Sequence, residues 1–289
     1  MRTVLVTAAD AGFFPLLVDM LTTVHEHRPN ADMSIAVMDV GLLPEQIEQL
    51  KPMVDRIIVP GWDVDFPARA GAPPAFRALT LRPFLPRYLP DYDLFVCLDA
   101  DTWLADWRAI ELLMQAARLD CLGIVPELHR GYRYLFNESN VRQNVYEGAK
   151  PLGEELARQL SSLPILNAGV FALKRDAPHW KIWADQLRQA LQGPLHRLVE
   201  QCALNAAVYK FGLPVHFLPA WCNWICGHGI PMYDPENRWL TEKYLPYEKL
   251  SLVHLTDLKN RTVNVNTTTG QKVQMKLNYR DFAAWRDKG

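Results

Sequence analysis

An apolar run over residues 95–98 ends in two aspartates, Asp99 and Asp101. Side chains alternate along an extended chain, so both carboxylates leave the strand end on the same side, with small Ala100 between them. Two such anions repel each other unless a cation lies between them. Carboxylate oxygens suit Mg²⁺ or Mn²⁺, and such an ion can in turn carry a diphosphate. The pattern therefore predicts a divalent metal site, although a solvated turn after a buried strand can have the same sequence.

A phosphatase is the first alternative for this motif. Haloacid-dehalogenase-type phosphatases also place Asp-x-Asp after an apolar strand, usually near the N-terminus, with Thr or Val two residues beyond the second aspartate. This chain has Trp103 there, and its motif lies a third of the way along the sequence. Both differences disfavour the phosphatase.

Composition limits the remaining classes. The 289 residues are 49% hydrophobic and 22% charged, which is enough to bury a sizeable core in one large domain with a small appendage, or in two intimate domains. The net charge of -1 provides no general field for nucleic acid or an anionic membrane, so any phosphate must be held locally. We also expect no transmembrane segment, because no apolar run reaches about 18 residues.

The cysteines indicate a reducing compartment. Five of them, scattered along the chain, do not form a disulfide framework, and we expect a cytoplasmic protein. Cys222, Cys226 and His228 have a spacing that zinc could use, but a clear fourth ligand is missing. Buried thiols are the favoured interpretation.

The hydrophobic pattern predicts an α/β fold. Short apolar runs alternate with helical patterns, as a parallel sheet with crossover helices requires. Strands are expected over residues 3–6, 34–38, 56–59, 95–98, 122–125 and 170–173. Helices are expected over 12–26, 44–51, 76–88 (broken at Pro83 and Pro86), 107–119, 154–160, 178–192 and 198–211. A β-hairpin over 262–266 and 273–277 and a short helix near 282–285 end the chain, whereas 127–150 has no clean period and is expected to be an irregular loop or lid.

Four later segments line up with the acidic strand. They are Asn167-Ala168-Gly169, Glu200-Gln201, Leu218-Pro219 with Trp221 and Asn223, and His254 followed by Lys259. In this order they resemble the nucleotide-sugar glycosyltransferases of the GT-A type, most closely glycosyltransferase family 8, and the resemblance covers roughly residues 3–260. It implies a GT-A, Rossmann-like mixed sheet, mainly parallel and flanked by helices, over 1–260, with 261–289 as a hairpin-and-helix appendage of the same domain.

The family resemblance also implies a reaction. Its members move a sugar from a nucleoside-diphosphate sugar, for this chain a UDP-hexose, to an acceptor that the sequence does not identify, with retention of anomeric configuration. A non-catalytic nucleotide-sugar-binding protein of the same fold is the alternative. A sugar nucleotidyltransferase is disfavoured, because residues 8–12 after the first strand are too poor in glycine for its loop.

The resemblance assigns residues to this reaction. Asp99, Asp101 and His254 would hold Mn²⁺ or Mg²⁺, and the imidazole favours Mn²⁺. The catalytic candidates are Glu200, Gln201 and Asn167. The donor-binding candidates are Thr7, Ala8, Ala9, Asp10, Arg77, Arg82, Asp99, Ala100, Asp101, Asn167, Ala168, Gly169, Gln201 and Lys259.

Three positions depart from the family pattern. Glu200 stands where the family usually has Asp, and Asp257 replaces a glycine that lets backbone approach phosphate. Lys259 falls one residue early, so it or Arg261 would supply the expected cation.

The irregular stretch suggests a place for the acceptor. Aromatic and basic residues over 128–150 could form a mobile wall of the acceptor site, since rings cover sugar faces and arginines hold polar groups. These residues are Tyr132, Tyr134 and Phe136 among Arg130, Arg133 and Arg142. The alternative is that the aromatics simply fill the core beneath a surface loop.

Overall fold

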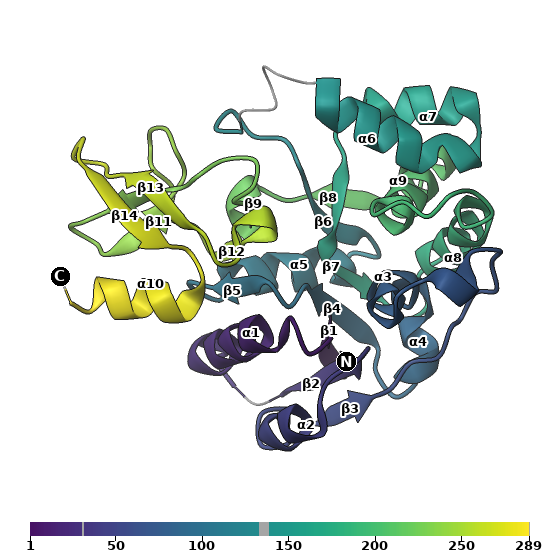
Figure 1. Cartoon of the computed structure of the whole chain (residues 1–289), viewed down its shortest axis with the longest axis horizontal. Helices are drawn as coiled ribbons and strands as arrows, with labels where there is room; N and C mark the ends of the chain where they lie inside the picture. Colours follow the sequence, from purple (N-terminus) through teal and green to yellow (C-terminus); the bar gives the residue numbers. More distant parts are fainter. Residues whose placement is uncertain (31, 133–138, 289) are drawn as a thin grey trace.

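A seven-stranded sheet forms the centre of the molecule in the computed structural model, which describes residues 1–30, 32–132 and 139–288 (Figure 1). The strand order is β3-β2-β1-β4-β7-β6-β8. The strands are β1 (Thr3–Ala9), β2 (Met33–Asp39), β3 (Arg56–Ile58), β4 (Leu94–Leu98), β6 (Leu122–Pro126), β7 (Leu166–Lys174) and β8 (Val215–Phe217). Strand β7 is antiparallel to both of its neighbours, and every other pair in the sheet is parallel. The predicted mixed, mainly parallel sheet is confirmed.

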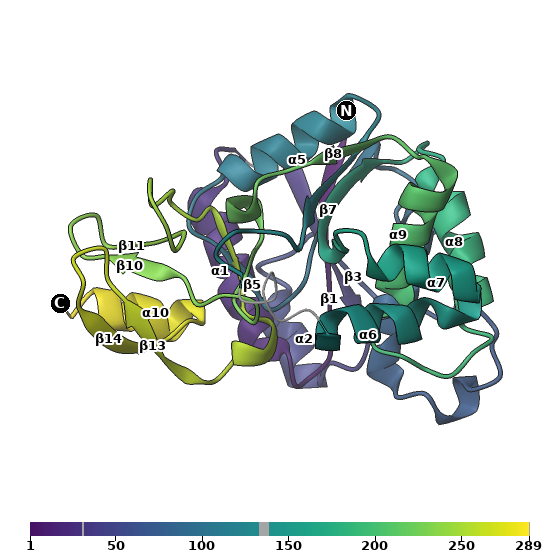
Figure 2. The same ribbon diagram turned by 90° about the horizontal axis from the view of Figure 1, so that it is seen from above.

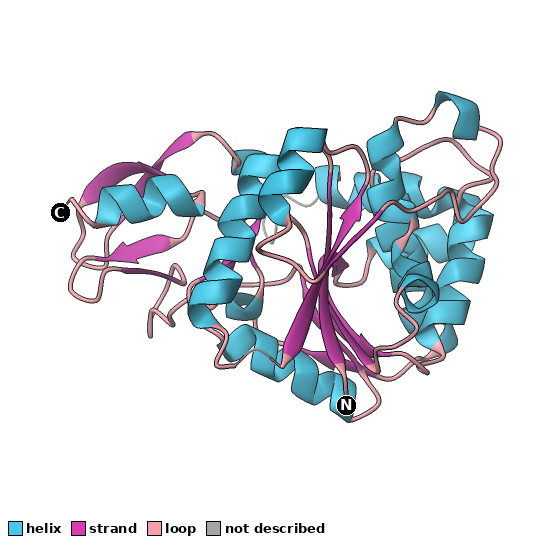
Figure 3. Ribbon diagram, turned by 90° about the horizontal axis from the view of Figure 1, so that it is seen from below, coloured by secondary structure: helices cyan, strands magenta, loops and turns pink. Residues whose placement is uncertain are grey.

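Helices cover both faces of the sheet, and Figure 3 shows the sheet edge-on between them. One face packs on α1 (Phe14–His27), α2 (Pro44–Leu50) and α5 (Arg108–Arg118). The other packs on α3 (Arg77–Thr80), α4 (Leu85–Tyr88), α6 (Ser139–Ala149), α7 (Glu154–Ser161), α8 (His179–Ala190) and α9 (Val199–Phe211). Alternate residues of a strand face opposite layers, so Leu5 enters one core and Val4 and Val6 the other. Burial on both faces explains why the strands read as continuous apolar runs.

Prolines break the segment that precedes β4. The predicted helix over 76–88 is divided into the turns η2 (Pro74–Phe76) and η3 (Arg82–Phe84) and the one-turn helices α3 and α4. Proline lacks the N–H that a continuous helix needs, and its ring clashes with the preceding turn. The break at Pro83 leaves Arg82 at the end of the sheet, where it lines a cavity.

A smaller lobe holds the C-terminal part of the chain (Figures 1 and 2). It contains β10 (Met232–Asp234) with β11 (Trp239–Thr241), the hairpin β13 (Thr262–Asn266) with β14 (Lys272–Lys276), and α10 (Tyr279–Arg286). The expected hairpin and short helix are therefore present. Trp103 joins this lobe to the acidic strand, because its ring stacks on Phe282 at 5.4 Å and its indole N–H donates to the Leu277 carbonyl.

A three-stranded sheet connects the two parts. Its order is β5 (Thr102–Leu104), β12 (Leu252–His254) and β9 (Trp224–Ile225). Because β12 runs antiparallel to β5, His254 lies opposite Thr102, directly after the two aspartates. These strands are only two or three residues long, too short for the hydrophobic pattern to indicate them.

The expectation of an irregular stretch over 127–150 is wrong in part, because α6 occupies Ser139–Ala149. Val141, Val145 and Ala149 recur at helical spacing, and the last two are buried in the core. Asn144 and Gly148 lower the helix propensity of the segment and obscure this pattern.

No helix in the described ranges is both long enough and apolar enough to span a membrane.

Candidate active site

A cavity of about 490 Å³ opens at one end of the central sheet. The carboxyl ends of β1 and β4 contribute Asp10, Asp99 and Asp101 to its lining. Because β7 is antiparallel to β4, its amino end reaches the same place and contributes Asn167 and Gly169. The lining also includes Ala8, Ala9, Ala100, Glu200, Gln201, His254 and Lys259. The fold thus gathers most of the residues that the sequence motifs selected.

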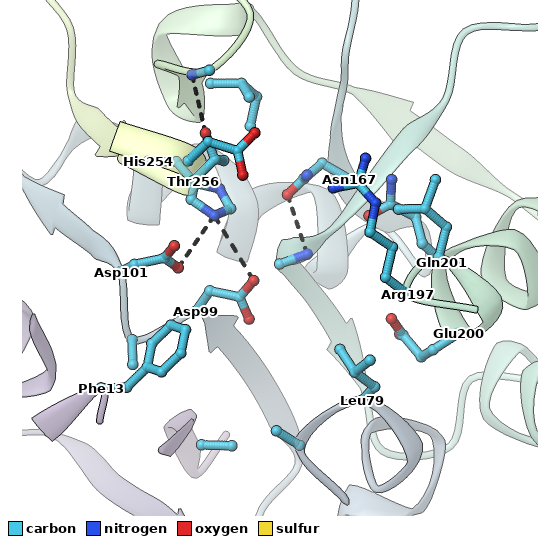
Figure 4. A pocket seen from close by; sticks show the side chains of 18 of the residues that line it. Phe13, Leu79, Asp99, Asp101, Asn167, Arg197, Glu200, Gln201, His254 and Thr256 are labelled. Carbon is cyan, nitrogen blue, oxygen red and sulfur yellow. Dashed lines mark hydrogen bonds and ion pairs between the residues drawn. The ribbon is translucent and has the colours of Figure 1, made fainter. Parts of the chain in front are cut away.

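Asp99, Asp101 and His254 form one acidic cluster in this cavity (Figure 4). The imidazole Nε2 atom of His254 lies 3.4 Å from Asp101 Oδ1 and 3.8 Å from Asp99 Oδ2. One ligand atom from each residue lies within 4.8 Å of the other two. Asp101 and His254 are buried, whereas 32% of the Asp99 side chain is exposed to the cavity. Two carboxylates and an imidazole are a donor set that fits Mn²⁺ well and Mg²⁺ acceptably.

Opposite charges beside each buried group offset the unfavourable effect of burying it in ionised form. Burial acts to raise the pKa of Asp101, but the charge and hydrogen bond of His254 outweigh it, and together with Lys259 they hold that pKa below its ordinary value. Burial conversely acts to lower the pKa of His254, and the negative charges of Asp101 and Asp99 raise it instead. The Lys259 ammonium lies 3.4 Å from Asp101 Oδ2 and 3.7 Å from the centre of the Phe13 ring. These cations neutralise the aspartates locally, which is what a metal ion would also do.

Arg82 links the acidic cluster to the helix α9. Its guanidinium donates from Nη2 to Asp99 and from Nη1 to Glu200 Oε2 at 2.8 Å. Burial raises the pKa of Glu200 to about 7, although Arg82 opposes this and Asp99 adds to it. The other oxygen of Glu200, Oε1, is buried and accepts no hydrogen bond from the described part of the chain. Glu200 therefore carries a proton far more readily than an ordinary glutamate.

Sequence reasoning missed Glu127, a carboxylate that lines the same cavity. Its Oε1 accepts from Asn167 Nδ2 at 2.7 Å and from Gln201 Nε2 at 3.1 Å, and its Oε2 lies 2.6 Å from His228 Nε2. Burial acts to raise the pKa of Glu127, but His228 and the two amides outweigh it and lower that pKa. Glu127 directly follows β6, so the rule that ligands bind at the carboxyl ends of strands could have found it.

Solved structures with a similar fold are glycosyltransferases. The apo structure of WbbM, a bifunctional glycosyltransferase, matches with a TM-score of 0.56 and 16% identity, covering 88% of this chain but only 45% of WbbM. The galactosyltransferase LgtC, in complex with donor and acceptor sugar analogues, matches with a TM-score of 0.54 and 15% identity, covering 87% and 86% of the two chains. An active-site mutant of LgtC matches with a TM-score of 0.51, 16% identity and the same coverage. The chain has the GT-A glycosyltransferase fold. No protein-family model and no curated protein sequence matches it.

Three donor-binding candidates do not line the cavity of this GT-A fold. Thr7 is buried on β1, and Ala168 donates its backbone N–H to Gln201 Oε1 at 3.4 Å. The guanidinium of Arg77 donates to the carbonyls of Pro60, Pro74 and Val40, which ties the loop before α3 to the sheet. A donor contact for each of these residues stays a prediction.

The segment after His254 has an unusual backbone. Thr256 adopts a left-handed conformation with φ 49°, which is uncommon for a β-branched residue. Its hydroxyl accepts a hydrogen bond from Gly227 N at 3.0 Å, which helps to hold it there. Asp257 is exposed and lines the cavity where the family has glycine.

The zinc alternative receives no support. Cys222 and Cys226 are buried, and burial raises the pKa of both thiols. Across the described ranges, the acidic cluster is the only group of three His, Cys, Asp or Glu side chains close enough to hold a metal, and it includes neither cysteine. His228 pairs with Glu127 instead.

For Tyr132, the structure favours core filling over an acceptor wall. Its side chain is 2% exposed, packs on Trp224 with a ring separation of 5.0 Å, and its hydroxyl accepts from Ile225 N at 3.0 Å. Arg130 donates to the carbonyl of Leu245. Arg142 is exposed on α6. Arg133, Tyr134 and Phe136 lie outside the described residues.

Proposed function

We propose that this protein is a metal-dependent glycosyltransferase that moves a hexose from UDP to an acceptor with retention of configuration. The observation that carries the proposal is the acidic cluster Asp99, Asp101 and His254, open to the same cavity as Glu127, Glu200 and Gln201. The cluster suits a cation that carries a diphosphate, while the carboxylates and amides opposite suit sugar hydroxyls. Similarity to the GT-A fold of LgtC and WbbM supports the same conclusion.

The donor would lie across the end of the sheet. Ala8 and Ala9 end β1 and Asp10 follows it, and these residues would border the base and ribose, as strand ends do in open α/β sheets. Asp99, Asp101 and His254 would hold Mn²⁺ or Mg²⁺. When bound, this ion would stabilise the charge that develops on the leaving diphosphate. Lys259, beside Asp101, is placed to contribute a second positive charge to the same phosphates.

The sugar would lie between the cluster and Glu127. Asn167 and Gln201 both donate to Glu127, so their amides have fixed orientations before a substrate arrives. Such preorganisation lowers the cost of aligning a substrate. Arg82 holds Glu200 against the cavity wall, where it would face the reacting carbon or the oxygen that leaves it.

The acceptor would approach from the smaller lobe. A second cavity of about 330 Å³ shares Gly227 and His228 with the first. Its lining combines apolar and amide side chains, a mixture that suits a saccharide. The side chains include Ile230, Met232, Leu258, Asn264 and Asn266.

A non-catalytic nucleotide-sugar-binding protein is the second candidate, and Asp257 is the observation that favours it. Its exposed carboxylate lines the cavity and would oppose the additional negative charge that develops on the diphosphate as the sugar–phosphate bond breaks, which would slow turnover more than it weakens binding. This candidate shares every binding prediction with the first, and differs only in turnover.

The test combines binding with turnover. Thermal unfolding of the protein with UDP, UDP-glucose or UDP-galactose should show a rise of several degrees that requires Mn²⁺, because a ligand of the native state stabilises it by mass action. Asp101→Asn should lose this rise while keeping the metal-free melting temperature within a few degrees.

Turnover is then measured as release of UDP from UDP-sugars, with water and with a panel of saccharides. Release that requires Mn²⁺ supports the glycosyltransferase. Mn²⁺-dependent binding with no release under any condition would support the binding protein. A parent protein that binds neither Mn²⁺ nor nucleotide would overturn both.

A further inference from the structure

A chain of hydrogen bonds joins the acidic cluster to Glu127 through two asparagines. His254 Nδ1 lies 3.1 Å from Asn223 Oδ1, and Asn223 Nδ2 donates to Asn167 Oδ1 at 3.0 Å. Asn167 Nδ2 then donates to Glu127 Oε1 at 2.7 Å. Asn223 and His254 are buried, as is Asn167. The two links made by Asn223 are therefore shielded from water, where a broken hydrogen bond costs most, and the link from Asn167 to Glu127 is partly buried at the cavity wall.

Donors and acceptors in this chain can alternate in only one direction. If the Nε2 lone pair of His254 were to bind the metal, the imidazole hydrogen would lie on Nδ1 and would require an acceptor there. Asn223 Oδ1 is that acceptor, so its NH₂ group must point to Asn167 Oδ1. The NH₂ group of Asn167 then points to Glu127, a carboxylate that only accepts when ionised.

We infer that Asn223 is a positioning residue that orients His254 for the metal and, through Asn167, ties the metal ligands to the carboxylate on the sugar side. This inference rests on the proposed function. Asn223 does not line the cavity, so it acts through its two neighbours and touches neither metal nor sugar. Asn223 directly follows the turn η6 (Ala220–Cys222). Its position is fixed because its own backbone N–H donates to the Ala220 carbonyl at 3.0 Å.

Two variants separate the role of the Asn223 amide oxygen from the role of its NH₂ group. Asn223→Asp keeps an acceptor for His254 Nδ1 but presents a second acceptor to Asn167 Oδ1. Rotation of the Asn167 amide cannot repair this, because its oxygen would then face the Glu127 carboxylate. Asn223→Ala removes both partners at once.

The experiment measures two affinities for each variant. Mn²⁺ affinity in the presence of UDP is followed by electron paramagnetic resonance of the free ion, and calorimetry gives the affinity for UDP-glucose and UDP-galactose relative to UDP. Asn223→Ala should weaken Mn²⁺ binding by about 10- to 100-fold, the usual effect of losing the partner of a histidine ligand. Asn223→Asp should keep the Mn²⁺ affinity within about threefold of that of the parent. The ratio of its UDP-sugar affinity to its UDP affinity should fall about tenfold. The exposed Asn30→Asp serves as the matched control and should change neither.

Each result decides the inference. Equal Mn²⁺ affinity in Asn223→Ala and the parent would overturn it, as would equal losses of Mn²⁺ affinity in the Ala and Asp variants. If Asn223→Ala does not fold, Asn223→Asp still decides. Substitution of a residue needed only for packing would not weaken sugar binding while leaving Mn²⁺ binding unchanged. A parent that binds no Mn²⁺ overturns the proposed function itself, and with it this inference, so the two failures are distinguishable.

Discussion

Gly169 and Asp99 lie so close together that a side chain at position 169 would overlap the Asp99 carboxylate. A Cβ built on Gly169 meets Asp99 Oδ2 and Asp99 Cγ, and it would lie 3.0 Å from Asn167 Oδ1. The backbones are also joined, because Asp99 N donates to the Gly169 carbonyl at 2.7 Å. Gly169 therefore makes room for the Asp99 carboxylate of the acidic cluster.

Gly169→Ala should displace Asp99 and weaken Mn²⁺-dependent UDP binding by about tenfold or more, because a metal site loses affinity when one ligand moves. Calorimetric titration of UDP in Mn²⁺ measures this. Gly61→Ala is the control, since no atom lies within 4 Å of a Cβ built there. Equal UDP affinities in Gly169→Ala and Gly61→Ala would show that the aspartate is not held by this contact.

Glu200 makes the stability of the metal-free protein depend on pH. Its folded-state pKa of about 7 lies above the ordinary value of 4.5, so the folded protein binds this proton more tightly than the unfolded chain. The stabilisation is full below pH 4.5 and is lost as the pH rises through 7. It amounts to an order of 3 kcal/mol at most.

Glu200→Gln imitates the protonated side chain and should not show this loss. We expect the free energy of unfolding of the parent to fall relative to that of Glu200→Gln between pH 5 and pH 8. Urea titrations of both proteins at several pH values measure the difference. A difference that stays constant over this range would mean that Glu200 titrates normally.

The acidic cluster illustrates what a sequence can predict about geometry. The placement of Asp99 and Asp101 on the same side of the strand end could be predicted, because it depends only on the extended backbone between them. His254 lies more than 150 residues away, and its approach depends on the three-residue pairing of β12 with β5. Only the resemblance to a known family could supply it.

Arg77, Arg82 and Glu127 illustrate what the sequence could not predict about the site. Arg77 and Arg82 belong to the same predicted helix, and the break at Pro83 together with the packing of the preceding loop decides that Arg82 alone of the two lines the cavity. Glu127 obeys the strand-end rule, but it opens a stretch without clear periodicity and belongs to none of the quoted motifs. Side-chain partners such as His228 depend on tertiary contacts that no local pattern contains.

Tyr132 should contribute to stability rather than to acceptor binding. Tyr132→Phe removes the acceptor for the buried Ile225 N–H and should cost about 1–3 kcal/mol of unfolding free energy. Tyr132→Ala should cost about 3–5 kcal/mol, because it also leaves a cavity beside Trp224. Chemical denaturation measures both, and Tyr244→Ala, at an exposed tyrosine, is the control. A Tyr132→Phe variant as stable as the parent but impaired with an acceptor would restore the acceptor-wall interpretation.

Asp257 should weaken nucleotide binding by charge repulsion. The side chain is exposed and lines the cavity that the diphosphate would enter, so Asp257→Asn should bind UDP with Mn²⁺ up to about fivefold more tightly at low salt. The gain should shrink at high salt, because screening acts on exposed charges. Asp257→Gly should show the same gain plus any effect of the freer backbone, and comparison with Asp257→Asn separates the two. Glu236→Gln, another exposed acid of the smaller lobe, should leave UDP affinity unchanged. If Asp257→Asn instead weakens UDP binding, then the carboxylate contributes to holding the metal or the nucleotide.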